Sequence, residues 1–270
     1  MIIDFHTHIF PEKIAAATID ELEKKAGVKA DTNGTMDGLL LSMERAGVDA
    51  SVILPVVTSP RQFDKVNRYA YDINRQYENA GGKVPKLISF GGIHPDSEDY
   101  KGQLKLLKSM GMKGIKLHPD YQGVNFDDIR YMRIVECATE LNMIIMVHAG
   151  IDIGIPNPIR CTPQMSAKVL DEVQPAKLVL AHLGGWKMWD EVEEILVGRK
   201  VYLDTAFIQS YIKEEQFLRI VRNHGEERIM FATDSPWSSQ PRMVQWIREC
   251  GLSQEALDAI CYKNALNLLQ

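Results

Sequence analysis

The chain of 270 residues is 45% hydrophobic and 25% charged, the composition of an ordinary soluble globular protein, and its length suits one large core. Its formal net charge of −5 lacks the basic excess that binding to nucleic acid or to an anionic membrane surface requires. No apolar stretch is long enough to span a bilayer and no leader precedes the first apolar run, so we expect a cytoplasmic protein of one domain, residues 1–270.

Short apolar runs alternate with amphipathic helical patterns along the chain, as in the repeated βαβ units of a parallel sheet. The expected strands are residues 2–8, 50–57, 86–93, 113–118, 143–148, 177–182, 200–204 and 228–233. The expected helices are residues 36–46, 61–80, 98–110, 127–141, 163–173, 188–197, 213–223 and 241–250, followed by a terminal helix at 253–269. Three longer connections, 9–35, 149–162 and 235–241, are expected to form lids and pocket walls.

The strand count and the placement of polar residues predict a closed (β/α)8 TIM barrel. An open, doubly wound sheet is the alternative, because its buried strands have the same apolar character. The barrel is favoured because polar residues follow strands 1, 4, 5, 6 and 8, and barrel enzymes build their sites at the carboxyl ends of their strands. The chain also lacks a glycine-rich phosphate loop after its first strand, where a dinucleotide-binding fold carries one.

Two histidines separated by one residue, His6 and His8, end the first expected strand. Side chains in a strand alternate between its faces, so both imidazoles should project from the same side while Thr7 points the other way. This spacing is typical of a metal site, although an accidental pair on an edge strand has the same sequence. Further polar residues at strand ends favour the metal site.

Those further residues are His148, His182 and Asp234, each of which follows an apolar run. Imidazoles and a carboxylate that converge at a barrel mouth form a site suited to zinc, with manganese, iron or cobalt as alternatives. A metal there would activate a bound water, and Asp234 could accept the proton of that water. The four cysteines form no Cys-x-x-Cys pair and are expected to be free thiols.

The strand-end motifs together resemble those of the amidohydrolase superfamily, specifically the amidohydrolase-2 group with its aminocarboxymuconate-semialdehyde decarboxylase-like enzymes. The resemblance covers nearly the whole chain, and the order of the motifs makes it specific. The matching segments are Asp4-Phe5-His6-Thr7-His8-Ile9-Phe10-Pro11, Gly114-Ile115-Lys116-Leu117-His118-Pro119, Val147-His148-Ala149-Gly150, Ala181-His182-Leu183-Gly184-Gly185, Thr233-Asp234-Ser235-Pro236-Trp237 and Lys263-Asn264-Ala265-Leu266-Asn267-Leu268-Leu269.

The resemblance implies one divalent metal ion held by His6, His8, His148 and Asp234, with zinc as the expected ion. It also implies that His182 lies beside the metal-bound water as a proton acceptor or electrophile, so that Asp234 and His182 form the catalytic pair. In two-metal relatives, His148 and His182 instead bind a second ion. We expect a single ion here.

Strand 4 carries Lys116, for which three interpretations are open: a carboxylated bridge between two metals, a cation that binds a substrate carboxylate, or a structural lysine with a buried stem. As an ammonium it would repel a second divalent ion and attract an anionic substrate. His118 shares its face of the strand and is expected to line the substrate pocket. Trp237 and Arg160 are further candidate substrate-binding residues, and Asp204 is a candidate acceptor that orients a ligand histidine.

The expected function is hydrolysis of a C–N or C–O bond in a small, anionic substrate by a metal-activated water. Non-oxidative decarboxylation is the alternative, because the same family performs both reactions on one scaffold and fold alone does not fix the reaction. A non-catalytic metal-binding protein is a third hypothesis, disfavoured because the complete residue set is present. A homodimer is left open.

Overall fold

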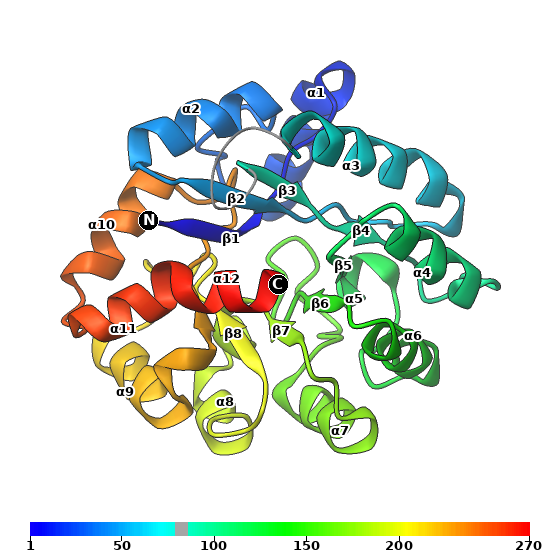
Figure 1. Cartoon of the computed structure of the whole chain (residues 1–270). Coiled ribbons are helices and arrows are strands. Elements are labelled where there is room, and N and C mark those ends of the chain that lie inside the picture. The colour runs from blue at the N-terminus through cyan, green and yellow to red at the C-terminus, as the bar shows by residue number, and fades with distance from the viewer. Residues whose placement is uncertain (79–85) are drawn as a thin grey trace.

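The strands of the computed structural model, which describes residues 1–78 and 86–270, run parallel to one another and form a (β/α)8 barrel (Figure 1). Two of them, β3 and β4, lie on either side of Phe90 in one extended segment and together form the third strand of the barrel. The barrel therefore has the predicted eight strands. The strands are β1 (Ile3–Thr7), β2 (Ala50–Ile53), β3 (Leu87–Ser89), β4 (Gly91–Gly92), β5 (Gly114–Leu117), β6 (Ile144–Val147), β7 (Leu178–Leu180), β8 (Tyr202–Asp204) and β9 (Ile229–Met230).

Hydrogen bonds between the first and last strands close the barrel. The Phe5 N–H donates to the Phe231 carbonyl at 2.9 Å, and the His8 N–H donates to the Ser235 carbonyl at 2.6 Å. The Asp234 N–H in turn donates to the His6 carbonyl at 2.8 Å. This seam brings the histidine pair of β1 beside the residues that follow β9.

A register shift in β1 aims the histidine pair into the barrel. The Asp4 carboxylate accepts a hydrogen bond from Gln240 at 2.7 Å, so this side chain faces the helix ring. A strict period of two would place His6 on the same outer face. The pairing of β1 with β2 shifts between Asp4 and Thr7, and such a bulge re-aims the side chains that follow it. His6 therefore points inward and contacts Asp204 and Lys116.

Helices surround the strands as a ring (Figure 1). Residues of the last helix, Ala265, Leu268 and Leu269, pack with apolar residues of the strands and cover the end of the barrel opposite the histidines. The helices are α1 (Glu12–Ala26), α2 (Met36–Ala46), α3 (Phe63–Tyr77), α4 (Tyr100–Ser109), α5 (Pro119–Gln122), α6 (Ile129–Glu140), α7 (Pro163–Val173), α8 (Trp189–Ile195), α9 (Glu214–His224), α10 (Gln240–Glu249), α11 (Gln254–Asp258) and α12 (Asn264–Leu269).

The structure corrects the sequence-based elements in three places. The connection 9–35, expected to be a loop, contains α1; Ala15 is its one buried residue, so the apolar stripe that would predict a helix is weak. The connection after β5 contains the short helix α5. The terminal helix expected at 253–269 is divided by a π-helical segment, Ala259–Lys263. Of the helix expected at 61–80, residues 79 and 80 lie outside the described residues.

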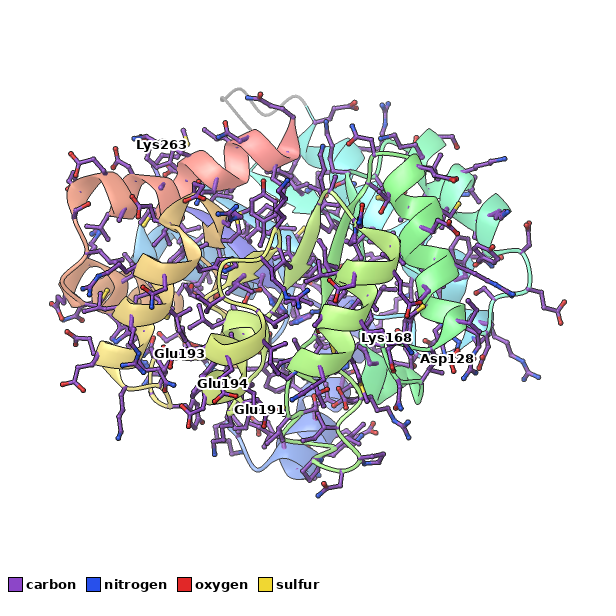
Figure 2. The ribbon with its side chains drawn as sticks, turned by 90° about the horizontal axis from the view of Figure 1, so that it is seen from below. Asp128, Lys168, Glu191, Glu193, Glu194 and Lys263 are labelled. Carbon is purple, nitrogen blue, oxygen red and sulfur yellow. The ribbon has the colours of Figure 1, made fainter. Side chains whose placement is uncertain are left out.

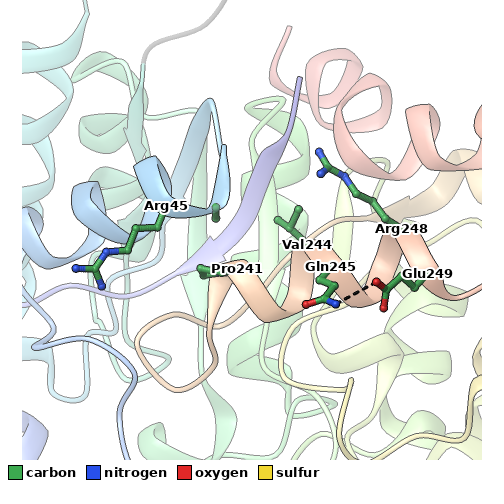
Figure 3. Close-up of a pocket in the computed structure, with 7 residues that line it drawn as sticks. Arg45, Pro241, Val244, Gln245, Arg248 and Glu249 are labelled. Carbon is green, nitrogen blue, oxygen red and sulfur yellow. Dashed lines mark hydrogen bonds between the residues drawn. The ribbon is translucent and has the colours of Figure 1, made fainter.

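Charged side chains cover the outer face of the helix ring (Figure 2). Among them, Lys168 of α7 lies 3.2 Å from Asp127, and Glu193 of α8 pairs with Arg219 at 2.6 Å. A groove on this outer face lies between α2 and α10, and Arg45, Pro241 and Arg248 are among the residues that line it (Figure 3). No helix in the described ranges has the length and apolar character that a membrane crossing requires.

Candidate active site

Three potential metal ligands converge where β1 meets the segment after β9. The Nε2 atoms of His6 and His8 lie 3.1 Å apart, and one carboxylate oxygen of Asp234, Oδ1, lies 3.3 Å from His6 Nε2 and 3.1 Å from His8 Nε2. His6 is buried, while His8 and Asp234 have side chains that are 14% and 13% exposed. The group therefore faces the barrel mouth and can be reached by a small molecule.

The hydrogen bonds of the two imidazoles decide where their protons lie. His6 Nδ1 donates to Asp204 Oδ2 at 2.8 Å, and His8 Nδ1 donates to the Leu54 carbonyl at 2.8 Å. In its neutral form, each ring therefore presents an unprotonated Nε2 to the other. Burial, Lys116 and the neighbouring histidines hold the pKa of His6 well below its usual value, which keeps this ring neutral.

This arrangement fits a divalent transition metal. Two lone pairs and a carboxylate oxygen that are 3.1–3.3 Å apart repel one another unless a cation lies among them. Ligand atoms around a tetrahedral ion with bonds of about 2.1 Å are spaced at roughly 3.4 Å. Asp204 supports the site from behind, because its other oxygen, Oδ1, accepts the N–H groups of His182 at 2.8 Å and Ala206 at 3.0 Å. The structure thus shows Asp204 as the acceptor for a histidine of the site, and the metal-binding role of that histidine stays a prediction.

Lys116 enters the site from β5. Its Nζ lies 3.2 Å from His6 Nε2 and, because that nitrogen is unprotonated, Lys116 is the donor. The side chain is almost completely buried. Burial lowers the pKa of Lys116 to about 8, while the carboxylates of Asp234 and Asp204 oppose this shift. Lys116 is therefore a buried amine in contact with a proposed metal ligand.

His148 does not join His6, His8 and Asp234. His182 Nδ1 donates to the Ala206 carbonyl at 2.9 Å, which leaves His182 Nε2 to accept from His148 Nδ1 at 3.0 Å. The remaining nitrogen, His148 Nε2, is buried without a hydrogen-bond partner. Burial and the neighbouring His118 and His182 hold the pKa of His148 well below its usual value.

A second group of potential ligands surrounds that nitrogen. It contains His118, His148 and Asp152, with Asp120 beside them. The rings of His118 and His148 stack at 4.2 Å with an interplanar angle of 8°. Burial raises the pKa of Asp120 to about 7, and repulsion from Asp152 adds to the shift. Sequence reasoning missed both aspartates because they lie beyond the strand ends; the signal available was their place in connections that follow β5 and β6.

The remaining predicted residues lie at the edge of the site. Trp237 is half-buried. Its backbone N–H donates to the Asp234 carbonyl at 2.8 Å, so its backbone is held next to Asp234. The N–H of Arg160 donates to Asp120 Oδ1 at 3.2 Å, but its guanidinium donates to Asn125 Oδ1 at 3.3 Å. The charged end of Arg160 is thus occupied outside the histidine cluster.

The fold and this cluster of histidines and aspartates define a TIM-barrel protein with a candidate metal site. Residues 3–270 match the family model Amidohydrolase of the amidohydrolase-2 group, so the chain belongs to this family, as the motifs predicted.

Several characterised proteins are similar to the chain. Decarboxylase orsB of Emericella nidulans is 21% identical over 285 residues, which cover 87% of this chain and 85% of that protein. The structure of 5-carboxyvanillate decarboxylase LigW from Sphingomonas paucimobilis matches with a TM-score of 0.71 and 14% identity, over 99% of this chain and 98% of that one. A dihydroxybenzoic acid decarboxylase from Polaromonas sp., with bound manganese and the inhibitor 2-nitroresorcinol, matches with a TM-score of 0.70 and 16% identity, over 99% and 96%. The structural matches confirm the barrel fold.

Proposed function

We propose that this protein is a metal-dependent enzyme that removes a carboxylate from a small molecule as carbon dioxide, without a redox step. The observation that carries the proposal is the position of Lys116. Its buried Nζ lies 3.2 Å from His6, and in the described part of the chain no carboxylate makes a hydrogen bond to it. An amine so placed can bind the carboxylate of a substrate at the metal group.

We propose that His6, His8 and Asp234 hold one divalent ion, with zinc expected first and manganese, iron or cobalt as alternatives. The manganese in the Polaromonas enzyme supports a metal of this class. His148, the fourth ligand that the family resemblance implies, would reach this ion only if its ring left His182. When bound, the ion would polarise an oxygen of the substrate.

The residues of this chain would then perform the remaining tasks. Lys116 would orient the carboxylate, and Asp234 or His182 would hold and deliver a proton. When the bond between the substrate carbon and its carboxylate breaks, the electron pair stays on that carbon, carbon dioxide leaves, and the carbon takes the proton. The decarboxylases among the similar proteins support this reaction over hydrolysis.

Hydrolysis of a C–N or C–O bond, the function expected from the sequence, is the second candidate. The observation that favours it is the position of Asp234, whose Oδ1 lies within 3.3 Å of both ligand nitrogens and could accept a proton from a water bound there. Metal binding without turnover of any substrate class would favour the third, non-catalytic hypothesis.

The test is a substrate panel for the metal-loaded protein. 5-Carboxyvanillate and 2,6-dihydroxybenzoate represent aromatic acids, and lactones and amides represent hydrolase substrates. We expect release of carbon dioxide from at least one acid and loss of that activity in Lys116→Ala. Lys113 lies just before β5 and is exposed, so Lys113→Ala is the matched control. Turnover confined to neutral lactones or amides, with Lys116→Ala unaffected, would overturn the proposal.

A further inference from the structure

The groove between α2 and α10, on the outer face of the helix ring, continues into a second cavity of about 460 Å³. Arg45 and Pro241 line both the groove and this outer cavity (Figure 3). The outer cavity is bounded by the connection before α2, by α2 and by the first turn of α10. Its described lining residues are all outside the candidate active site, so a ligand bound here would be separate from the proposed substrate.

The hydroxyl of Ser42 is a buried polar group without a partner at this cavity. Ser42 lines the cavity from α2 and is 6% exposed. Its Oγ makes no hydrogen bond to any residue that the structure describes. A buried hydroxyl without a partner is unfavourable, and a ligand oxygen at the floor of the cavity would satisfy it.

The side-chain amide of Asn33 offers a second donor. The Thr35 backbone N–H can only donate, so the amide oxygen of Asn33 accepts it at 3.1 Å, and the Thr35 hydroxyl donates to the same oxygen at 2.8 Å. The NH2 group of Asn33 is therefore left as a donor on the lining of the cavity. A side chain at Gly38 would collide with this amide, so glycine keeps its place open.

Helix α10 begins at the same cavity. Its N-cap residue, Ser239, makes no capping hydrogen bond through its side chain, so the first N–H groups of this ten-residue helix are not satisfied by their own cap. Ser239 and Pro241 both line the cavity. The N-terminus of a helix carries a partial positive charge and attracts anions.

Arg45 adds a full positive charge. Within residues 1–78 and 86–270 its guanidinium forms no ion pair, whereas Asp31, the one acidic residue on this lining, pairs with Arg242 at 3.2 Å. The charge that remains uncompensated at the cavity is therefore positive. A guanidinium surrounded by hydroxyl and amide donors suits an oxyanion, which arginine can bind through two parallel hydrogen bonds.

We propose that Arg45, Ser42, Asn33 and the first turn of α10 form a binding site for a phosphoryl group, either as free phosphate or as the ester of a small molecule. Donors from three separate segments suit a tetrahedral group, which presents oxygens in several directions, better than a planar carboxylate. The cavity leaves room beyond the phosphoryl group itself, and Leu41, which is 55% exposed, gives an apolar edge for the organic part of an ester.

The test is a calorimetric titration of the metal-loaded protein with inorganic phosphate. We expect saturable binding that weakens at least roughly tenfold in Arg45→Gln, which loses charge-assisted hydrogen bonds, and roughly two- to tenfold in Ser42→Ala, which loses a neutral one. Arg68→Gln removes an exposed arginine of α3 and is the matched control. It should bind phosphate like the unaltered protein.

A second titration, with phenyl phosphate, distinguishes the two sources of the phosphoryl group. Tighter binding than that of inorganic phosphate would support an ester whose organic part packs against Leu41. Equal or weaker binding would support free phosphate as the ligand.

The proposal is overturned if the unaltered protein binds neither compound, or if Arg45→Gln and Ser42→Ala bind phosphate as tightly as Arg68→Gln. The second outcome would place the bound phosphate elsewhere, the metal group included. The first outcome needs no variant, so misfolding of a variant cannot obscure it. Failure of the proposed function would be seen differently, as absence of turnover, and would leave phosphate binding in the outer cavity unchanged.

Discussion

His6 Nδ1 donates a hydrogen bond of 2.8 Å to Asp204 Oδ2, and both side chains are buried. The partners come from β1 and β8, which are separated in the barrel by β9. Because Asp204 fixes the proton of His6 on Nδ1, it leaves Nε2 free for a metal ion. A carboxylate in this position also raises the basicity of the histidine.

We therefore expect Asp204→Asn to weaken binding of the resident metal by roughly 10–100-fold, the usual effect of losing such an orienting partner. Chelator competition measures the affinity. Asp190→Asn, which alters an exposed carboxylate bonded to Gln216, is the control and should leave metal binding unchanged. Equal metal affinity in both variants would show that Asp204 does not act through His6.

One ion per chain should remain bound through gel filtration, because His6, His8 and Asp234 can each supply a ligand atom to it. Metal analysis should give close to one equivalent, and His8→Ala should lose it. Weaker retention in His148→Ala would support the fourth ligand expected from the sequence; unchanged retention would contradict it. Two retained equivalents, or a mass increase on Lys116 that matches carboxylation, would exclude the single-ion site.

His182→Asn is expected to keep the fold and the metal but to lower turnover by roughly 10²–10⁴-fold, the usual cost of losing a general acid or base. The asparagine side chain can still donate to the Ala206 carbonyl, which His182 Nδ1 contacts at 2.9 Å. The decisive comparison is metal content against rate. Loss of metal together with activity would make His182 a ligand and remove its proposed role in proton transfer.

The buried, hydrogen-bonded position of His224 predicts a pH dependence of the protein's stability that does not involve the candidate active site. Its Nε2 donates to the Val201 carbonyl at 2.8 Å, and its Nδ1 accepts the Gly198 N–H at 3.2 Å. Burial lowers the pKa of His224 below its ordinary value of 6.5, and the nearby Arg228 adds to this shift. The neutral ring therefore stabilises the fold above about pH 6.5, and this contribution is lost as the pH falls through the folded-state pKa.

The measurement is the unfolding temperature at about pH 7.5 and at about pH 5, on either side of the ordinary histidine pKa. The decrease between the two should be smaller in His224→Gln than in the unaltered protein. Other histidines contribute equally to both proteins, so the difference isolates His224. An identical decrease in both proteins would show that His224 does not contribute.

The barrel was predictable because its strands carry the strongest signal in the sequence. β5, β6 and β7 lie within a few residues of their expected bounds, since each is an apolar run buried on both faces. Helix α1 was not predictable from periodicity, because most of it is exposed and little selects an apolar stripe.

The site was predictable in part. The period of two placed His6 and His8 together, as the structure shows, but it could not reveal the bulge that turns them inward, since a bulge depends on pairing with β2. The orientation of His148 depends on a bond to His182 from the next strand, which no local pattern encodes. Asp152 lies in a connection whose path is set by tertiary contacts, so its approach to His148 was also not foreseeable.

Because the group of His6, His8 and Asp234 joins β1 to the segment after β9, it can be completed only late in synthesis of the chain. His6 and His8 are synthesised long before Asp234, their partner across the seam, which follows only after β9 has been made. Bound metal would link the first and last strands of the barrel, and a nascent chain that lacks the segment after β9 has only the two histidine ligands. Retention of the ion thus reports that both ends of the barrel have been made and joined.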